Sequence, residues 1–406
     1  MQNNNTIKLL KLQEKNIKIN KEVIDVENNT ATFYISKPIV KTPCPCCETL
    51  TKRIHDHRNQ RIKHTPINGF KTFLVLQKTR LICTNCNKKF YMDYSDIVNP
   101  RFRSSNQLFW KIINELKLSC SFKDVAKINF CSIGVVIRYL HFFSYLMLWQ
   151  NITTLPKRIG IDEFKGNCDN SKYLLHIFDL DTNKTIKILN TRNCCDIINF
   201  FNQITNRNDV ELVTMDLYSP FKKAVQTKLK NAVIVADRFH YTRIVANAMD
   251  SLRLEIWRNT KGIEKKYLKH LKKKLLKDIE SIPKDRLLEF EVNLNYAFDI
   301  SSELKYGYQL YQNFLRIKDA DTYQEKCKRF RDWLDDAESC TIPSFKSAAE
   351  TLIKWNKEIL NSFKYTYSNG PTEGKNNKIK VIKRIAFGFR NCINFENRIK
   401  IRDLYI

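Results

Sequence analysis

Three acidic residues lie in local contexts that suit divalent-metal chemistry. Asp162 ends a predicted strand at 158–164, Asp216 ends a predicted strand at 210–215, and Glu373 begins a late predicted helix. Neighbouring strand ends can bring two carboxylates together, and a helix can lay a third across them. Such a cluster repels itself unless cations neutralise it. Because all of these ligands are oxygens, we expect Mg²⁺ or Mn²⁺.

Two such ions, roughly 3.5–4 Å apart, would clamp the attacking and leaving oxygens of an in-line phosphoryl displacement. This chemistry predicts a nuclease or a phosphoryl-transfer enzyme. The plainer interpretation is that acids at strand ends are turn residues that face solvent. The strand pattern alone leaves open whether Asp216 or Asp237 joins Asp162, since each follows an apolar strand.

The late helix carries a second pattern. Glu373, Asn377, Lys380 and Arg384 follow at steps that place them on one helical face. Lys380 and Arg384 would extend the acidic site into a basic stripe that can follow a DNA backbone. An ordinary amphipathic helix with a wet face would give the same spacing.

Paired cysteines predict a metal site of another kind. Four of them form two CxxC knuckles: Cys44, Cys47, Cys83 and Cys86. Four thiolates at two tight turns can enclose a tetrahedral zinc ion, and an Asn-Gly turn between the knuckles predicts a hairpin. Cys46 could replace Cys47 as a ligand. The histidines at positions 55, 57 and 64 are possible substitutes, but Cys₄ explains the spacing better.

A predicted helix at 121–128, a short turn and a second helix at 133–140 have the form of a helix-turn-helix. Lys123, Lys127 and Arg138 would face phosphate groups. The predicted small core consists of Val125, Ala126, Ile128, Val135, Val136 and Tyr139. An ordinary helical hairpin is the competing interpretation. The neighbouring zinc knuckles and the overall charge favour DNA binding.

The order of elements predicts the scaffold that positions these residues. Between residues 158 and 237 we expect three strands, a helix, a strand, a helix and a strand. The first three strands can form a meander, and the later ones need helical crossovers. This order matches an α/β fold of the ribonuclease-H-like type. A charged, mostly helical stretch follows.

The expected organisation has four parts. Residues 1–43 form an N-terminal segment, 44–92 a zinc ribbon, 100–150 a helix-turn-helix domain, and 157–406 a catalytic domain with a helical insertion at about 245–362. The Lys-rich stretch 261–277 within this insertion fits either a DNA-contacting helix or a solvated face.

Composition agrees with a nucleic-acid partner. The 406 residues carry 70 Lys and Arg against 42 Asp and Glu, a net charge of +28. Such a surplus favours a polyanion, although an AT-rich genome would also raise the Lys content. The first residues lack the apolar core of a signal peptide, and no apolar run is long enough to span a membrane. We therefore expect a cytoplasmic, DNA-associated protein.

The combined motifs resemble the ISL-three family of bacterial insertion-sequence transposases. The resemblance covers residues from about 44 to 398. It is carried by the four cysteines, by Ile-Gly-Ile-Asp-Glu at 159–163, Thr-Met-Asp at 214–216 and Ala-Asp-Arg-Phe-His at 236–240. The longest motif is Ser-Asn-Gly-Pro-Thr-Glu-Gly-Lys-Asn-Asn at 368–377, which runs into Lys-Arg-Ile-Ala-Phe-Gly-Phe-Arg-Asn at 383–391.

The resemblance implies a catalytic triad of Asp162, Asp216 and Glu373, with a helical insertion before the glutamate. It also implies that Asp237 and His240 form an auxiliary Asp-x-x-His element. The expected activity is binding of terminal inverted repeats in double-stranded DNA, cleavage, and strand transfer by a homo-oligomer. The alternatives are a DNA-binding regulator with an inactive core and a nuclease that never joins strands.

Overall fold

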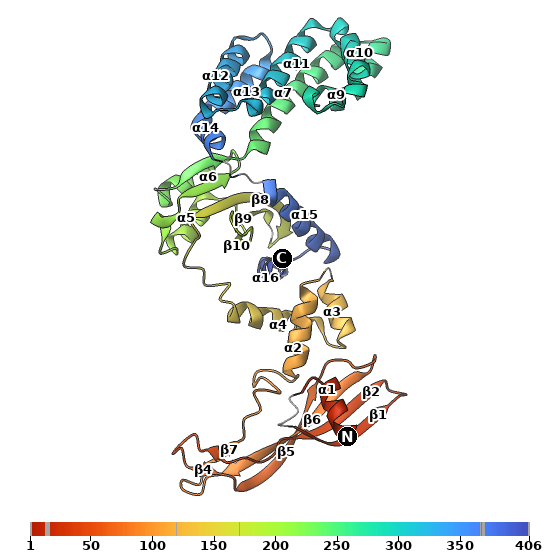
Figure 1. Ribbon diagram of the computed structural model, residues 1–406, viewed down its shortest axis with the longest axis vertical. Coiled ribbons are helices and arrows are strands. Elements are labelled where there is room, and N and C mark those ends of the chain that lie inside the picture. Colours follow the sequence, from red (N-terminus) through yellow and green to blue (C-terminus); the bar gives the residue numbers. More distant parts are fainter. Residues whose placement is uncertain are drawn as a thin grey trace. The chain divides into compact units, whose positions relative to one another are not determined.

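The computed structural model describes residues 2–12, 17–118, 120–169, 171–365, 367 and 370–404, with side chains described for all of these except 2–5 and 370–373. The chain divides into two compact units (Figure 1). One unit comprises Met1–Asn151 together with Val381–Ile406, and the other comprises Ile152–Lys380.

The first unit begins with a five-stranded sheet in the order β1-β2-β6-β5, in which β7 also pairs with β6. Its strands are β1 (Lys18–Asp25), β2 (Thr30–Ser36), β5 (Ile54–Lys63), β6 (Lys71–Ile82) and β7 (Lys89–Tyr91). Alternate residues of β2 and β6 are buried, and β2 runs parallel to β6. The expected boundary at residues 43 and 44 therefore falls inside one continuous sheet.

Short elements flank this sheet. Helix α1 (Gln2–Leu9) precedes it, and β3 (Thr42–Pro43) pairs with β4 (Leu50–Thr51). The predicted hairpin turn joins β5 to β6, with Asn68 and Gly69 both at positive φ. Two consecutive positive φ angles match the turn that best suits the twist of a hairpin, which explains the Asn-Gly pair.

Helices α2 (Asn106–Leu116), α3 (Phe122–Ile128), α4 (Ile133–Leu146) and α16 (Cys392–Asp403) pack together in the same unit. A capping box between Ser121 and Asp124 starts α3. Of the predicted core residues, Val125, Ala126, Val136 and Tyr139 are buried. The prediction for Ile128 is wrong: it is 49% exposed, because the last turn of α3 leaves it on the outer face.

Helix α16 belongs to this first unit, although the expected boundaries place it with residues 157–406. It packs against α2 and α4, and Ile401 enters their apolar core. Helix α16 therefore completes the apolar core of α2 and α4, although it is far from them in the sequence.

The second unit holds a five-stranded sheet in the order β10-β9-β8-β11-β12. Its strands are β8 (Arg158–Cys168), β9 (Ser171–Asp179), β10 (Thr185–Leu189), β11 (Leu212–Met215) and β12 (Val233–Ala236). β8, β9 and β10 form an antiparallel meander, whereas β11 runs parallel to both β8 and β12. The observed order of strands and helices is the predicted one.

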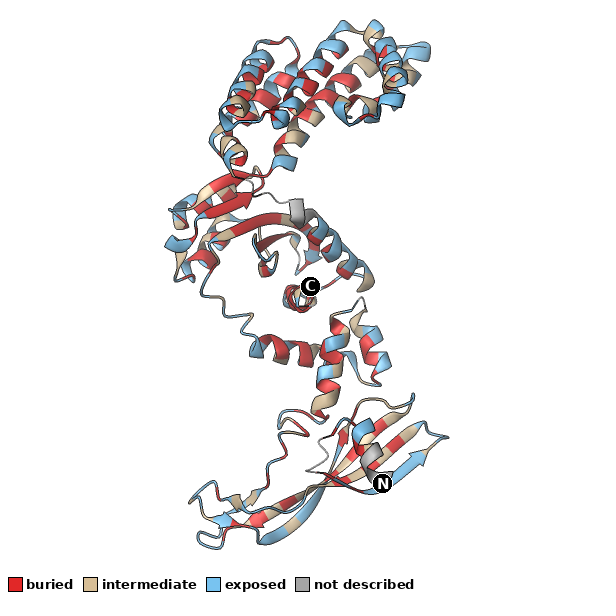
Figure 2. Ribbon diagram, in the orientation of Figure 1, coloured by how far each residue is buried: buried red, intermediate tan, exposed pale blue. Residues whose placement is uncertain are grey.

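One face of this sheet packs on α5 (Cys194–Asn202) and α6 (Ser219–Lys228). Ile159, Ile161 and Val213 contribute to this core from the strands, and Phe201 and Phe221 from the helices. Buried residues dominate the strands (Figure 2). Successive residues of a strand point to opposite faces, so Gly160 and Asp162 lie on the other face.

A helical region follows β12 and has its own apolar core. Its helices are α7 (Arg238–Asn259), α8 (Gly262–His270), α9 (Lys272–Leu275), α10 (Lys284–Ile300), α11 (Ser302–Leu315), α12 (Tyr323–Ser339), α13 (Pro343–Lys354) and α14 (Asn356–Lys364). In the Lys-rich stretch, Leu268, Leu271 and Leu275 are buried. The leucines of this stretch therefore anchor α8 and α9 to the region.

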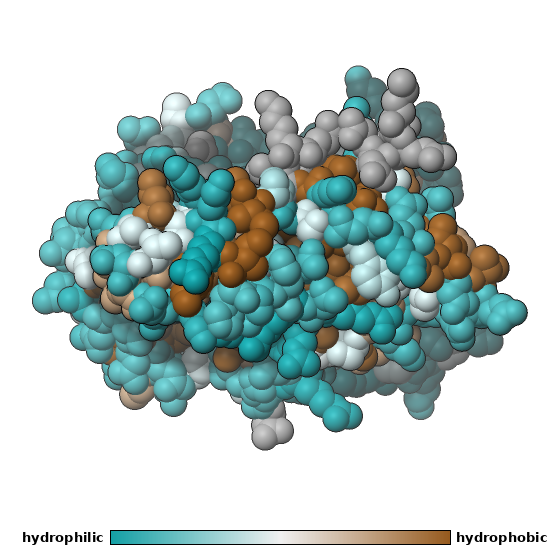
Figure 3. Space-filling model, turned by 90° about the horizontal axis from the view of Figure 1, so that it is seen from below, coloured by the Kyte–Doolittle hydropathy of each residue, from teal (hydrophilic) through white to brown (hydrophobic). Residues whose placement is uncertain are grey.

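Helix α15 (Gly370–Ile385) then carries the chain toward α16. Within the described residues, no single helix is long and apolar enough to cross a membrane, and one bent pair, α3 with α4, passes on length and composition only. Hydrophilic side chains cover most of the face shown in Figure 3, and apolar side chains form separate patches on it.

Candidate metal centres and nucleic-acid interface

Asp162, Asp216 and His240 form a cluster whose ligand atoms all lie within 4.8 Å of one another. The sheet register explains the meeting of the two aspartates. Ile161 pairs with Met215 across parallel strands β8 and β11, so the next residue of each strand emerges at the same edge. His240 comes from the first turn of α7, directly after β12. Asp216 directly follows the end of β11, as predicted, whereas the prediction that Asp162 ends a strand is wrong, because β8 continues to Cys168. The register between β8 and β11 favours Asp216 over Asp237 as the neighbour of Asp162.

Close packing fixes β8 beneath this cluster. Gly160 lies opposite Phe178 of β9, and a Cβ atom on Gly160 would come within 2.0 Å of the Phe178 ring. Asp162 lies opposite His176, which is fully buried and whose Nε2 lies 3.1 Å from Thr185 Oγ1. Burial lowers the pKa of His176 well below its usual value. The histidine beside Asp162 is therefore held in its neutral form.

Asp162 is 8% exposed. Its Oδ1 accepts a hydrogen bond from the Glu163 backbone N–H at 2.7 Å, and its Oδ2 accepts a short one from Asn376 Nδ2. Burial, with the nearby carboxylate of Asp216, raises the pKa of Asp162 to about 7. The cluster therefore holds two carboxylates in a setting that opposes their joint ionisation, as expected of a site that receives cations.

His240 links the carboxylates. Its Nε2 lies 3.0 Å from Asp216 Oδ1 and 3.7 Å from Asp237 Oδ2. Burial lowers the pKa of His240, but the three aspartates around it outweigh this effect, so the net shift is upward. Apart from this contact, buried Asp216 Oδ1 has no hydrogen-bond partner within the described residues.

Glu373 lies in α15, and its side chain is outside the described residues. Asn376, three residues further on, was not singled out from the sequence but contacts Asp162 directly. Its position one turn after Glu373 was the available signal. Glu163 and Arg192 were also missed; they form an ion pair of 2.7 Å whose acidic member follows Asp162.

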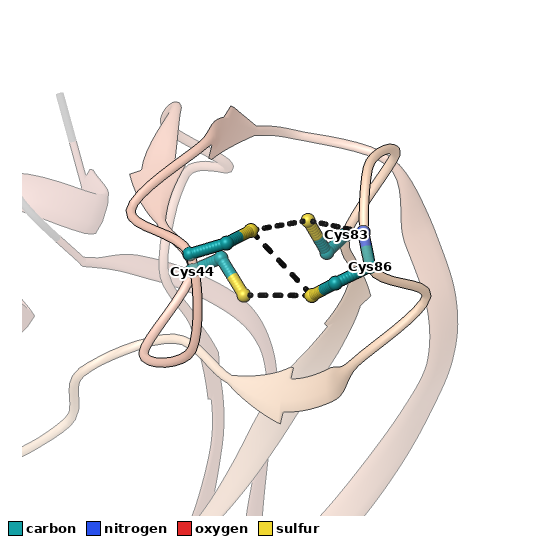
Figure 4. Close-up of side chains that lie close together, drawn as sticks. Cys44, Cys83 and Cys86 are labelled. Carbon is teal, nitrogen blue, oxygen red and sulfur yellow. Dashed lines mark hydrogen bonds between the residues drawn. The ribbon is translucent and has the colours of Figure 1, made fainter.

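The four predicted cysteines converge. The Sγ atoms of Cys44 and Cys86 are 3.6 Å apart, and Cys47 Sγ lies 3.5 Å from both Cys83 Sγ and Cys86 Sγ. Figure 4 shows the labelled side chains pointing toward a common centre. Zn–S bonds of about 2.3 Å in a tetrahedron require sulfur atoms roughly 3.8 Å apart, so the cluster fits zinc.

The two CxxC knuckles have the same backbone conformation and the same kind of N–H contact to sulfur. The residues after the second cysteines, Glu48 and Asn87, have a φ of 58°. Backbone N–H groups lie 3.5 Å from Cys44 Sγ and 3.3 Å from Cys83 Sγ. Hydrogen bonds from the Thr49 side chain and backbone lower the pKa of the Cys47 thiol to about 6, which favours the thiolate that zinc binds.

The alternative zinc ligands lie elsewhere. Cys46 is exposed and outside the cluster, so Cys47 is the fourth thiol. Buried His64 contacts Ser105 Oγ at 2.7 Å and the Leu10 carbonyl oxygen at 3.0 Å. His55 and His57 contact Asp56 and Thr79 respectively.

The basic residues predicted to contact DNA are all exposed: Lys123, Lys127, Arg138, Lys380 and Arg384. The bend between α3 and α4 is 108°, within the range of helix-turn-helix motifs. Ile379 and Ile382 are buried, so α15 has the apolar face that its sequence predicted.

The structure therefore brings together a four-cysteine cluster that fits zinc and a buried cluster of two aspartates and a histidine. Comparison with known families identifies the class. Residues 159–399 match a DDE transposase family model described as "Transposase", and residues 41–86 match a zinc-finger of the IS204, IS1001, IS1096 and IS1165 transposases. The first match covers more than half of the chain. The chain therefore belongs to the ISL3 (ISL-three) family of DDE transposases of insertion sequence elements.

Individual relatives agree with this assignment. The chain is 22% identical over 404 residues to the transposase for insertion sequence element IS1001 of Bordetella parapertussis, covering 91% of each chain. It is 22% identical over 260 residues to the IS1557 transposase of Mycobacterium tuberculosis (strain CDC 1551 / Oshkosh), covering 58% of this chain and 57% of the relative.

A third similarity is shorter. The chain is 40% identical over 104 residues to a Lactococcus lactis subsp. lactis protein named "ATP-dependent protease". This match covers 25% of the chain and spans 31% of that protein. The whole protein's named activity cannot be transferred from such a segment.

Proposed function

We propose that this transposase binds the terminal inverted repeats of its insertion sequence and catalyses metal-dependent DNA cleavage and strand transfer. The observation that carries the proposal is the buried meeting of Asp162 and Asp216 beside His240. Glu373 on α15 would complete the catalytic set, and Asp237 and His240 would be auxiliary residues.

The proposed catalytic domain has a ribonuclease-H-like fold, supported by the mixed sheet order and by helices on its face. Helices α7 to α14 would be the insertion between the second aspartate and the glutamate. We further propose that the zinc ribbon, with its ligands between residues 44 and 92, and a helix-turn-helix of α3 and α4, between residues 100 and 150, precede this domain.

The acidic residues fit Mg²⁺ or Mn²⁺, because their donor atoms are oxygens and one of them, Asp216 Oδ1, is buried without a hydrogen bond. When bound, two such ions would supply Lewis-acid stabilisation of the attacking and leaving oxygens. Asp162 and Asp216 would hold them, and His240 would fix Asp216. The neighbouring aspartates raise the pKa of His240, which favours its charged form beside that carboxylate.

The remaining parts would bind DNA. A structural Zn²⁺ held by the four clustered cysteines would fold the ribbon. Exposed Lys123, Lys127 and Arg138 would contact the repeats, and Lys380 and Arg384 of α15 would contact the DNA backbone. A homo-oligomer is proposed because transposition must pair two element ends.

The decisive experiment uses the full chain and double-stranded DNA carrying one element end. Asp162→Asn and Asp216→Asn should abolish Mg²⁺-dependent cleavage and strand transfer while repeat binding persists. Asp181→Asn, a change of an exposed turn residue that pairs with Arg158, is the control and should remain active. Retained cleavage in either cluster variant would overturn the proposal.

The same assay separates the alternatives. A wild-type chain that binds repeats but never cuts them would be a regulator with an inactive core. A wild-type chain that cuts but does not join supplied pre-cut 3′ ends to target DNA would be a nuclease.

A further inference from the structure

Asn376 contacts the acidic cluster directly, although the three-carboxylate scheme does not include it. It lies on α15, one helical turn after position 373, and residues three apart share a helix face. Its Nδ2 donates a short hydrogen bond to Asp162 Oδ2. An ionised carboxylate only accepts hydrogen bonds, so the amide must present its NH₂ group to Asp162.

The other end of this amide has no partner. Asn376 Oδ1 is buried and, within the part of the chain that the structure describes, accepts no hydrogen bond. A buried, unpaired oxygen of this kind costs about 1–3 kcal/mol. Native structures tolerate such an oxygen where an ion or an ordered water meets it.

The position of Asn376 Oδ1 beside Asp162 limits which group could bind this oxygen. Amide bond lengths place Oδ1 about 2.2 Å from Nδ2, and therefore within roughly 5 Å of Asp162 Oδ2. Asp216 Oδ1 is likewise buried without a hydrogen bond. Asp216 Oδ1 has the contact with His240 Nε2 at 3.0 Å, whereas Asn376 Oδ1 has no polar partner within the described residues.

We propose that Asn376 belongs to the divalent-cation site: its NH₂ group holds Asp162 in place, and its amide oxygen is a further oxygen ligand. Amide oxygens are ordinary ligands for hard cations, which prefer several neutral and charged oxygens together. This inference rests on the proposed function, because it assumes a cation between Asp162 and Asp216.

The neighbouring residue explains why α15 can deliver this amide. Buried Lys375 donates a short hydrogen bond to the backbone carbonyl of Asn183, in the turn between β9 and β10. This contact ties the start of α15 to the sheet that carries Asp162. The helix is thus anchored one residue before the proposed ligand.

The test measures Mn²⁺ binding to the full chain, without DNA, by electron paramagnetic resonance of the free ion. Asn376→Ala should weaken binding by about tenfold or more, the usual effect of removing a residue that supports a metal site. Asn376→Asp keeps an oxygen ligand and should bind Mn²⁺ more tightly than the alanine variant. Asn206→Ala is the control, because Asn206 makes two hydrogen bonds to the Leu155 backbone. It should leave Mn²⁺ affinity unchanged even if it lowers stability.

The outcomes separate this inference from the proposed function. Wild-type affinity in Asn376→Ala, together with lost binding in Asp216→Asn, would overturn the role of Asn376 alone. An Asn376→Asp variant no better than alanine would overturn the ligand role of the oxygen. Unchanged Mn²⁺ binding in Asp216→Asn would instead contradict the cation site itself.

Discussion

Arg398 of α16 offers a quantitative test of how the last helix completes the first unit. Its guanidinium donates to three backbone carbonyls at the end of α2 and just beyond it: Leu116, Leu118 and Cys120. The side chain is buried, and burial lowers the pKa of Arg398 to about 10, so it remains charged at pH 7. Carbonyls at a helix C-terminus lack partners within the helix, and a cation there is favourable.

Replacement by methionine keeps the volume but removes the donors. Leu116 is fully buried, so its carbonyl would remain without a partner and cost about 1–3 kcal/mol. Leu118 is 45% exposed, so water can replace its lost hydrogen bond, as at partly exposed Cys120. With smaller losses at these two carbonyls, we expect Arg398→Met to destabilise the packing of α16 on α2 by about 3 kcal/mol.

Hydrogen–deuterium exchange measures this locally, which is needed because a chain of several units does not unfold in one step. Amides of α2 and α16 should exchange roughly 100-fold faster in Arg398→Met. Arg390→Met, at an exposed position, is the control and should exchange as the wild type does. Unchanged protection of α16 in Arg398→Met would refute the reasoning that these hydrogen bonds hold the helix.

Three further predictions concern the other sites. We expect elemental analysis to find zinc in the wild type and in Cys46→Ser but not in Cys47→Ser; equal zinc contents in the two variants would contradict the assignment. Arg138→Ala should weaken repeat binding and reduce the salt slope of the affinity by about one, measured by fluorescence anisotropy at several salt concentrations. Burial lowers the pKa of His64 to about 4 in the folded state, from a usual 6.5. Its neutral form therefore supports folding above pH 6.5, and about 3 kcal/mol of stability is lost as the pH falls to 4. A nuclear magnetic resonance titration of His64 near pH 6.5 would contradict this.

Local spacing predicted much of the two metal sites. A CxxC knuckle confines its own thiols to one turn, so only the pairing of the two knuckles depended on the fold. Asp216 directly follows an apolar strand, as its local sequence predicted, but β8 continues past Asp162 to Cys168. The choice between Asp216 and Asp237 needed the register between β8 and β11, which no single strand encodes.

What the sequence did not predict depends on long-range packing. Strand β2 pairs in parallel with β6, across the expected boundary of the zinc ribbon. Ile128 fits a helical apolar pattern, yet the turn after α3 leaves it exposed. The role of Asn376 required knowing that α15 lies against the face of the sheet that carries Asp162. Contacts between segments that are far apart in the chain leave no periodic pattern in the sequence, so they could not be predicted from it.

The central claim is that Asp162, Asp216 and Glu373 share divalent cations. Anomalous diffraction from crystals of the full chain soaked in Mn²⁺ tests it most directly. The account predicts a manganese peak bound by oxygens of all three carboxylates, at about 2.0–2.3 Å from each. A peak elsewhere, or a Glu373 carboxylate more than about 10 Å from the two aspartates, would contradict it.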